Sequence, residues 1–245
     1  MQLIKALHSR IPDTMEREQL PLTAEGFHQF NQAAHEHENT EFRVAGQALI
    51  HLGIRNQELG HMEEDWLEDG PHGLQVRIPR RTKCWKDGGC QECRDDDNGA
   101  PPGFWSPKTE HGARVIPVPS DYQNHYLDER EEIELPSLLR SWLKLNGPMA
   151  MSRNKVRHIV YKLAQETKIH ELQGHGLVER TISRDPELYP DIYVNDLRGS
   201  WACQCIRSEC NRFRVRDWGG WGDVSMLNKY VRFVGGGNGE DRIKY

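Results

Sequence analysis

The stretch VNDLRGSW at residues 194–201 decides how the rest of this chain is interpreted. It places Arg198 near the start of a helix that we expect over residues 196–207. A second stretch, GWGDVSMLNKY at residues 220–230, supplies a Gly-Trp pair and then Tyr230 on the next short helix. Arginine grips phosphate oxygens with its planar fork, and tyrosine can act as a nucleophile. The order therefore predicts a phosphate clamp followed by a tyrosine that attacks the phosphate.

Length and composition indicate a polar globular protein. The chain has 245 residues, of which 36% are hydrophobic and 28% charged, with a formal net charge of -5. No apolar run approaches the roughly 20 residues that a membrane helix needs, and residues 1–5 do not begin a signal peptide. We therefore expect no membrane partner and a cytoplasmic location.

The charged residues are segregated along the sequence. A net negative charge argues weakly against a nucleic-acid partner, but binding depends on where the positive charge lies. One group of basic residues contains Arg77, Arg80, Arg81 and Lys83, and a second contains Arg207, Arg212, Arg214 and Arg216. Segregation of this kind is compatible with one DNA-facing side, although solvated charged faces would give the same pattern.

Hydrophobic periodicity and capping residues predict an α+β fold, mostly helical with a small antiparallel β-sheet. Helices are expected over residues 23–37, 41–52, 138–145, 152–164, 196–207 and 224–233, with a short one through 58–59. Strands are expected at 74–79 and 113–118. The loop at 84–105 is rich in Gly, Pro, Cys and Asp, and so long a loop is usually functional or held by something.

Two more stretches carry residues with the chemistry of a phosphate site. GIRNQEL at residues 53–59 puts Arg55 two residues after the glycine that is expected to end a helix. WSPKTEHGAR at residues 105–114 puts Lys108 beside the second expected strand. Each stretch alone is weak, because an arginine at a helix start or a lysine in a hairpin usually has a structural role.

In their order and context, these stretches resemble the tyrosine recombinases, or phage integrases, and most closely those of haloarchaea and their viruses. The segment at 53–59 resembles the first arginine box, and the segment at 105–114 resembles the hairpin box with its lysine. Asn195 to Arg198 resembles a His-x-Leu-Arg box, and Gly220-Trp221 resembles a Gly-His/Trp pair. Tyr230 follows Trp221 by nine positions, which is the family spacing.

The resemblance implies a function and a set of roles. The chain would be a site-specific recombinase that breaks and rejoins double-stranded DNA through a 3′-phosphotyrosyl intermediate, acting as four protomers on two duplexes. In that scheme Arg55 and Arg198 hold the scissile phosphate, Lys108 is the general acid and Tyr230 the nucleophile. Trp221 and Asn195 position the phosphate. The chemistry needs neither a metal nor a nucleotide, and we expect Arg77 and Arg81 to add DNA contacts.

The resemblance covers residues 21–235, which would be the catalytic domain. Residues 1–20 are interpreted as an arm or remnant, too short for the DNA-binding domain that precedes the catalytic domain in most integrases, and residues 236–245 as a flexible tail. Two residues depart from the pattern. Asn195 replaces a histidine, and an amide cannot act as a base, so reduced activity is expected. Gly199 stands where histidine or lysine often follows the second arginine.

The six cysteines fall into two groups of three, which in a cytosolic chain points to metal or buried thiols before disulfides. Cys84, Cys90 and Cys93 lie in the long loop and include one Cys-x2-Cys pair, as in zinc sites. A structural zinc would need a fourth ligand, for which His72, His111 or an aspartate of residues 95–97 are candidates. Three free thiols are the alternative. The other group, Cys203, Cys205 and Cys210, is expected to pack in or beside the helix that follows Arg198.

Two other functions stay open at this point. Asn195 and the short N-terminal segment would also suit a catalytically weak relative that binds DNA and modulates a full-length recombinase. The cysteine loop would suit a zinc-stabilised DNA-binding module. The recombinase hypothesis requires Arg55, Lys108, Arg198, Trp221 and Tyr230 to converge on one basic concave surface.

Overall fold

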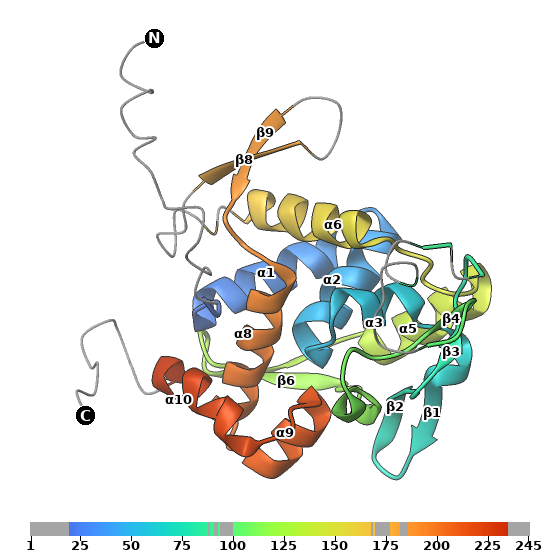
Figure 1. Ribbon diagram of the computed structural model, residues 1–245. Helices are drawn as coiled ribbons and strands as arrows, with labels where there is room; N and C mark the ends of the chain where they lie inside the picture. Colours follow the sequence, from blue (N-terminus) through green and yellow to red (C-terminus); the bar gives the residue numbers. More distant parts are fainter. Residues whose placement is uncertain are drawn as a thin grey trace.

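The computed structural model describes residues 20–87, 89–90, 93, 100–167, 169, 177–181 and 186–234 (Figure 1). The predicted arm, apart from Leu20, and the predicted tail lie outside these residues. The α-helices are α1 (Ala24–Glu36), α2 (Thr40–Leu52), α3 (Asn56–His61), α5 (Leu135–Asn146), α6 (Arg153–Glu166), α8 (Val194–Arg207), α9 (Arg212–Gly219) and α10 (Asn228–Val234). Short 3-10 helices are η2 (Glu64–Trp66), η3 (Glu110–Gly112) and η4 (Val224–Leu227).

Helix α2 is the centre of the fold. Ten of its thirteen residues are buried, and α1, α5, α6 and α8 pack around it (Figure 1). Its first turn is capped by Asn39, whose side chain accepts the backbone N–H of Glu41, and its end is capped by Gly53. A helix that is apolar on nearly all sides belongs in a core, which is where the structure places it.

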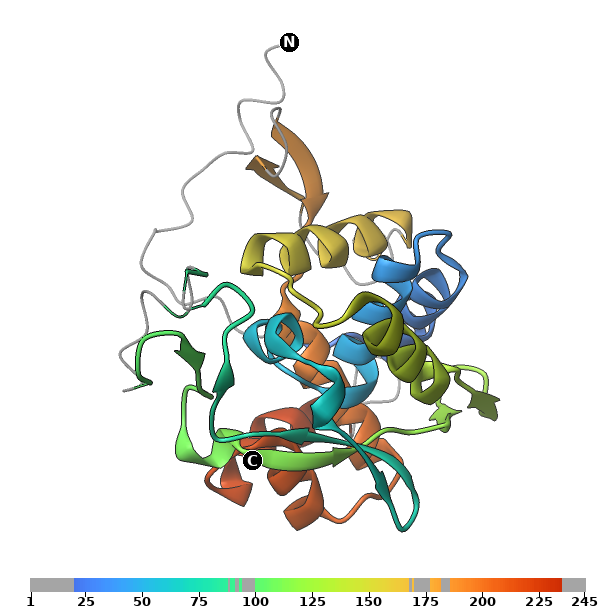
Figure 2. The same cartoon turned by 90° about the vertical axis from the view of Figure 1, so that its right-hand side faces the viewer.

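The strands form small antiparallel sheets. They are β1 (Leu67–Gly70), β2 (Gly73–Ile78), β3 (Thr82–Lys83), β4 (Phe104–Trp105), β5 (Arg114–Pro117), β6 (Asp121–Asn124), β7 (Glu129–Glu132), β8 (Leu177–Thr181) and β9 (Pro186–Pro190). The main sheet has the order β1-β2-β5, with Val76 opposite Ile116. Both of those side chains are buried, so the register puts the apolar face of the sheet on the core. Figure 2 shows β2 and β5 side by side across the domain.

The C-terminal helices form a second packed cluster against α8. Trp201, Cys203, Val215, Leu227 and Tyr230 are buried together there. The beginning of the described chain is tied to the same helix, since Leu22 N–H donates to the Ser200 hydroxyl at 2.7 Å and Leu20 N–H to Asp196 at 3.1 Å. Helix α8 therefore joins the N-terminal segment, the core helix α2 and the C-terminal helices.

The predicted fold class, mostly helical α+β with a small antiparallel sheet, is confirmed, and so are the two predicted strands as the pair β2–β5. Helix α9 and the hairpins β6–β7 and β8–β9 were not predicted. The sequence of α9, RFRVRDWG, alternates like a strand, but Asn211 accepts the N–H of Phe213 and caps it as a helix. The strands of β6–β7 are mostly polar and only four residues long, which leaves little periodicity to read.

Several helix boundaries were predicted wrongly, and helix α5, expected over residues 138–145, spans Leu135–Asn146. Helix α8 begins at Val194, two residues earlier than expected, because the Asp196 carboxylate accepts the N–H of Tyr193 at 2.8 Å as an N3 cap. The last predicted helix, over 224–233, is divided into η4 and α10. Among the described residues, no helix combines the length and apolarity needed to cross a bilayer.

Candidate active site

Arg55 is placed by the tight turn between α2 and α3. Gly53 ends α2 with φ +57°, and a Cβ there would lie 2.3 Å from the Trp201 ring, so only glycine fits. Arg55 then caps α3, and its backbone N–H and Nη1 donate to the Glu58 carboxylate at 2.7 and 2.8 Å. The side chain of Arg55 remains about a quarter exposed. The turn thus holds Arg55 at the surface, above a buried carboxylate.

The buried Glu58 carboxylate pairs with two arginines, Arg114 and Arg55. Its carboxylate accepts Nη1 and Nη2 of the buried Arg114 at 2.7 and 2.9 Å, besides Nη1 of Arg55. Burial alone would raise the pKa of Glu58, but the charges of Arg114, Arg55 and Arg198 hold that pKa well below its usual value. Arg114 also donates to the carbonyls of Gly112 and Trp218. One carboxylate therefore ties α3, β5 and α9 together, and the three arginines around it leave excess positive charge.

Replacing Glu58 with glutamine is expected to reduce the free energy of unfolding by about 3–5 kcal/mol, because Arg114 would lose its buried counter-charge. Since the folded pKa lies below the unfolded value of about 4.3, the stabilisation is complete above that value and declines as the pH falls. Urea unfolding at pH 7 and at pH 3–4 measures both effects. The matched control is Glu68→Gln, which removes an exposed pair with Arg77 and should change little. Equal losses in the two variants would contradict the role of Glu58.

Arg198 lies in α8 and is 6% exposed. Its Nη1 donates to the Gly53 carbonyl at 2.6 Å and its Nη2 to the Gly219 carbonyl. Its guanidinium carbon lies 4.4 Å from the centre of the Trp221 ring, in a cation–π contact. Burial, with the positive charges of Arg55 and Arg114, lowers the pKa of Arg198 to about 9, although the charge of Glu58 opposes this. The guanidinium is thus held rigidly beside like charges, which is the electrostatics of an anion site.

Tyr230 and Trp221 complete this cluster. Their rings lie 5.7 Å apart, and Tyr230 is 2% exposed. Burial raises the pKa of the Tyr230 phenol to about 12, while the charge of Arg198 works in the opposite direction. The ring packs against α8 at Gly199, where a Cβ would lie 3.1 Å from Tyr230 Cε1 and 3.2 Å from Pro21. Gly199 therefore leaves the space in which Tyr230 sits, and a larger side chain there would push the ring away.

Lys108 and Asn195 meet Arg55 in a neighbouring cavity of about 340 Å³. Both are exposed, and Asn195 projects from the first turn of α8. Arg153 and Arg157, one turn apart on α6, also line this cavity. Four cations and the Glu58 carboxylate thus surround one pocket, which favours an anionic ligand. The six predicted catalytic residues therefore form two groups. Arg55, Lys108 and Asn195 line the cavity, whereas Arg198, Trp221 and Tyr230 contact one another. The groups adjoin where the charge of Arg55 acts on Arg198.

The other two predicted DNA-binding residues lie elsewhere. Arg77 projects from β2 and pairs with Glu68 on β1, with Nη2 2.7 Å from Oε2. Arg81 is exposed between β2 and β3. Neither lines the cavity that Arg55 and Lys108 share. A contribution of these two arginines to DNA binding stays a prediction.

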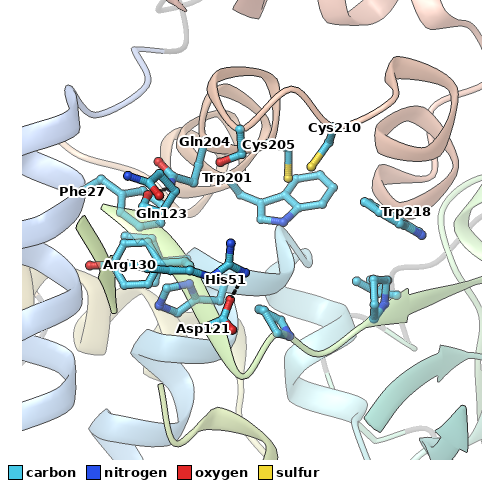
Figure 3. Close-up of a pocket in the computed structure, with 16 residues that line it drawn as sticks. Phe27, His51, Asp121, Gln123, Arg130, Trp201, Gln204, Cys205, Cys210 and Trp218 are labelled. Atoms are coloured by element: carbon cyan, nitrogen blue, oxygen red, sulfur yellow. Dashed lines mark hydrogen bonds and ion pairs between the residues drawn. The ribbon is translucent and has the colours of Figure 1, made fainter. Parts of the chain in front are cut away.

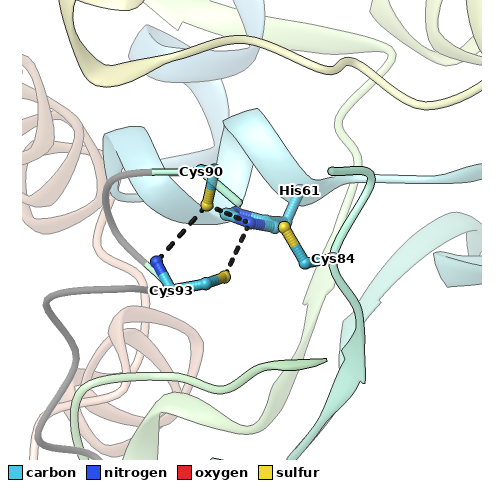
Figure 4. A group of neighbouring side chains, drawn as sticks. All are labelled: His61, Cys84, Cys90 and Cys93. Carbon is cyan, nitrogen blue, oxygen red and sulfur yellow. Dashed lines mark hydrogen bonds between the residues drawn. The ribbon is translucent and has the colours of Figure 1, made fainter. Parts of the chain in front are cut away.

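The loop cysteines form a cluster with His61 (Figure 4). The ligand atoms of His61, Cys84, Cys90 and Cys93 lie within 4.8 Å of one another, so the cluster could hold a metal ion. His61 was not predicted as a ligand, and the predicted fourth ligands His72 and His111 do not lie in this cluster. His72 is exposed at the turn between β1 and β2, and His111 lies beside Gly222, 3.0 Å from a Cβ placed there. Residues 95–97 are outside the described part of the chain.

Trp201 is one of the residues that line a second cavity, of about 340 Å³ (Figure 3). Apolar and aromatic side chains dominate its walls, including Phe27, Tyr122 and Trp218. His51 also lines it, and burial lowers the pKa of that imidazole to about 3, so it is neutral. None of the predicted catalytic residues lines this cavity.

The second cysteine group packs as predicted. Cys203 is fully buried in α8, and its thiol lies 3.7 Å from the Tyr230 carbonyl. Cys205 and Cys210 are half-buried beside it, at the end of α8.

Sequence reasoning missed Arg153, Arg157 and Glu58 as parts of the site. A signal existed for the two arginines, because basic residues in the first turns of a helix oppose the helix dipole and suggest an anionic partner. Ser152 caps α6 through the N–H of Lys155, and no acidic residue lies in the first turn. Glu58 and His61 depend on contacts with residues 56 and 32 positions away, for which no local pattern exists.

The comparisons with known proteins point to one fold. No protein-family model and no curated protein matches the sequence. The Tn1549 transposon integrase in complex with transposon right-end DNA matches with a TM-score of 0.53 at 14% identity, over 94% of this chain and 65% of that one. A lambda integrase dimer bound to a COC′ core site matches with a TM-score of 0.52 at 13% identity, over 96% of this chain and 67% of that one. XerH recombinase bound to palindromic difH substrate matches with a TM-score of 0.50 at 13% identity, over 89% of this chain and 51% of that one.

These likenesses establish the fold of the tyrosine-recombinase catalytic domain. At identities of 13–14%, the likeness supports a shared fold and nothing about activity. The chain spans less than two thirds of the transposon integrase chain. Activity, substrate and assembly are therefore argued from the residues of this chain.

Proposed function

We propose that residues 21–235 are a tyrosine recombinase catalytic domain that cleaves and rejoins double-stranded DNA. The observation that carries the proposal is that Arg198 and Tyr230 both contact the Trp221 ring. Arg198 Cζ lies 4.4 Å from the centre of that ring, and the centre of the tilted Tyr230 ring lies 5.7 Å from it. A cation beside a tyrosine is what an attack on a phosphodiester requires, because the arginine neutralises the oxygens and the phenoxide forms the bond.

In this mechanism Arg198 and Arg55 bind the nonbridging oxygens of the scissile phosphate. Two bonds to backbone carbonyls fix the Arg198 fork, and Glu58 fixes that of Arg55, so little reorganisation is needed when the phosphate arrives. Tyr230 Oη attacks phosphorus, the bond to the 5′-oxygen breaks, and Lys108 gives that oxygen a proton. The product is a 3′-phosphotyrosyl link and a free 5′-hydroxyl, and the reverse reaction reseals the strand.

The tyrosine must become accessible before it reacts. At 2% exposure, the Tyr230 hydroxyl reaches a DNA phosphate only when α10 shifts away from α8 or the DNA displaces its neighbours. Helix α10 has seven residues and follows the short 3-10 helix η4, and its shift has to break the packing of Tyr230 against α8. The transfer itself needs no metal or nucleotide.

The proposed substrate is duplex DNA, with four protomers acting on two duplexes. The cationic pocket of Arg55, Lys108, Arg153 and Arg157 supports DNA as the ligand. The haloarchaeal or viral kinship stays a prediction from the sequence. A pool of duplexes with randomised sequence and one nick near the cleavage position tests the function, because a short fragment lost after cleavage prevents resealing. The account expects a covalent protein–DNA species on a denaturing gel.

Asn195→His is expected to accelerate cleavage at pH 7 by about 10²-fold, the lower end of general acid–base catalysis. The phenol of Tyr230, with a pKa raised to about 12, is protonated at neutral pH, so the wild-type rate should rise steadily with pH. An exposed histidine with a pKa of about 6.5 would accept the proton and flatten that profile above pH 7. Initial rates of adduct formation from pH 6 to 9 measure this.

Asn195→Gln is the matched control, because it changes the side chain without adding a base and should not flatten the profile. Unchanged rates and an unchanged pH profile in Asn195→His would argue against a catalytic role for position 195.

A second candidate is a DNA-binding relative that modulates a full-length recombinase. The burial of Tyr230 and the amide at position 195 favour it. It predicts salt-dependent DNA binding that Arg55→Ala weakens, with no covalent species at any salt concentration.

A further inference from the structure

Four side chains from two separate parts of the chain converge with the spacing of a metal site. His61 is the last residue of α3, whereas Cys84, Cys90 and Cys93 follow β3. His61 Nε2 lies 3.5 Å from the sulfurs of both Cys90 and Cys93. Around a tetrahedral zinc with Zn–S of about 2.3 Å and Zn–N of about 2.0–2.1 Å, nitrogen and sulfur are about 3.6 Å apart. The two observed separations therefore match those between nitrogen and sulfur ligands of one zinc ion.

The groups behind these four side chains orient them as ligands. His61 Nδ1 lies 2.9 Å from the Gln57 carbonyl, which can only accept, so Nδ1 carries the proton and the Nε2 lone pair faces the sulfurs. Backbone N–H groups of Cys93 and Lys86 donate to the sulfurs of Cys90 and Cys84 at 3.3 and 3.4 Å. Donors aimed at sulfur stabilise the thiolate form, which is the form that binds metal.

Three of the four side chains in the cluster are buried. His61, Cys84 and Cys90 are 4%, 2% and 4% exposed, and Cys93 is half-buried. Four protein ligands of the Cys3His type, without an open position, are the set used by structural zinc sites. A hard cation would prefer oxygen ligands, and none of the four atoms is an oxygen.

We propose that His61, Cys84, Cys90 and Cys93 bind one structural zinc ion, which clips the segment leading to Lys108 onto helix α3. The ring of Trp105, three residues before Lys108, stacks on the His61 imidazole at 5.1 Å and 15°. Cys84 N–H donates to the Gly103 carbonyl at 2.8 Å, which ties the cysteine loop to β4. The second part, that the clip positions Lys108 against Arg55, rests on the proposed function.

The short elements around the cluster explain why a metal ion would stabilise this region. Strands β3 and β4 have two residues each and form their own two-stranded sheet, and α3 has six residues. An isolated ribbon or single helical turn of this size is marginal in water. The free energy of zinc binding adds to the free energy of folding, so the ion would hold both elements in place.

Metal analysis of the purified full chain tests the site. We expect one zinc per chain after desalting with a weak chelator, loss of that zinc in Cys90→Ser and His61→Ala, and retention in Cys210→Ser, which removes a thiol outside the cluster. A wild-type chain with less than about a tenth of a zinc, or variants that keep full zinc, would overturn the proposal.

Cobalt substitution guards against variants that fail to fold. The wild-type chain loaded with Co²⁺ should show the thiolate charge-transfer and strong ligand-field bands of a tetrahedral site. Octahedral cobalt bands alone, or a disulfide between two of these cysteines in protein kept under reducing conditions, would overturn the site. Neither measurement depends on activity, so the site can stand even if the proposed function fails.

The positioning claim has its own readout. Cys90→Ser and Lys108→Ala should both slow cleavage of ordinary DNA, and both defects should largely disappear on DNA with sulfur in place of the bridging 5′-oxygen. A thiolate leaves without a proton, so such DNA does not need the general acid. Restored cleavage in Lys108→Ala but not in Cys90→Ser would show that the metal site acts elsewhere, and would refute the clip to Lys108.

Discussion

Tyr230→Phe is expected to abolish the covalent protein–DNA species entirely. The substitution removes only the hydroxyl, while the ring keeps its packing against Trp221 and Gly199. Without the oxygen no bond to phosphorus can form, and water has no comparably placed route to the phosphate. The variant should bind DNA as well as the wild-type chain, because the arginines are unchanged. A gel assay with the nicked duplex pool, run beside a binding titration, measures both.

Tyr122→Phe is the matched control for that experiment. Tyr122 is also buried, and its hydroxyl donates to Glu131 at 2.6 Å. It lines the mostly apolar cavity of Figure 3 and not the cationic pocket. We expect the adduct to persist in this variant. An adduct that persists in Tyr230→Phe and disappears in Tyr122→Phe would identify Tyr122 as the nucleophile and would contradict the role proposed for Tyr230.

Arg198→Ala is expected to lower the rate of adduct formation by about 10³- to 10⁵-fold, the range for arginines that neutralise a transferring phosphoryl group. Loss of Arg198 removes a charge from the proposed phosphate site and leaves Trp221 without its cation–π partner. The carbonyls of Gly53 and Gly219 also lose a donor, so some loss of stability will accompany the loss of rate. Single-turnover rates and urea unfolding of the same samples separate the two effects.

Two variants sharpen the result for Arg198. Arg198→Lys keeps the charge but loses the planar fork of donors that reaches both carbonyls, so it should recover only part of the rate. Arg207→Ala removes another arginine-to-carbonyl bond on α8, the one to Phe233 at 3.2 Å, and should leave most of the activity. Equal activity in the alanine variants of both arginines would mean that Arg198 supports the fold and not the phosphate.

Much of the fold could be predicted because its helices carry local signals. Thr23, Asn39 and Ser152 each accept a backbone N–H in the first turn of the following helix, and Gly53 has the left-handed conformation of a helix end. These contacts lie within a few residues of one another, so a local pattern is enough to read them. Helix α9 could not be predicted from a local pattern, because its alternating sequence resembles a strand although Asn211 caps it as a helix.

The site was less predictable, because its coupling is long-range. Arg55, Lys108, Asn195, Arg198, Trp221 and Tyr230 were selected from motif order, and the structure brings them into two adjoining groups. The carboxylate of Glu58, which links Arg55 to Arg114, follows from no spacing in the sequence. The metal cluster shows the same limit, since three cysteines were visible together but His61 is supplied by a helix more than twenty residues earlier.

The most direct test of the central claim is to locate the attached nucleotide by mass spectrometry. The wild-type chain is trapped on the nicked duplex pool, digested with nuclease and protease, and the modified peptide is sequenced. The account predicts a peptide containing Tyr230, with a nucleotide joined to Tyr230 through its 3′-phosphate. A nucleotide on another residue, a 5′-phosphate link, or no modified peptide over the full range of pH and salt would contradict it.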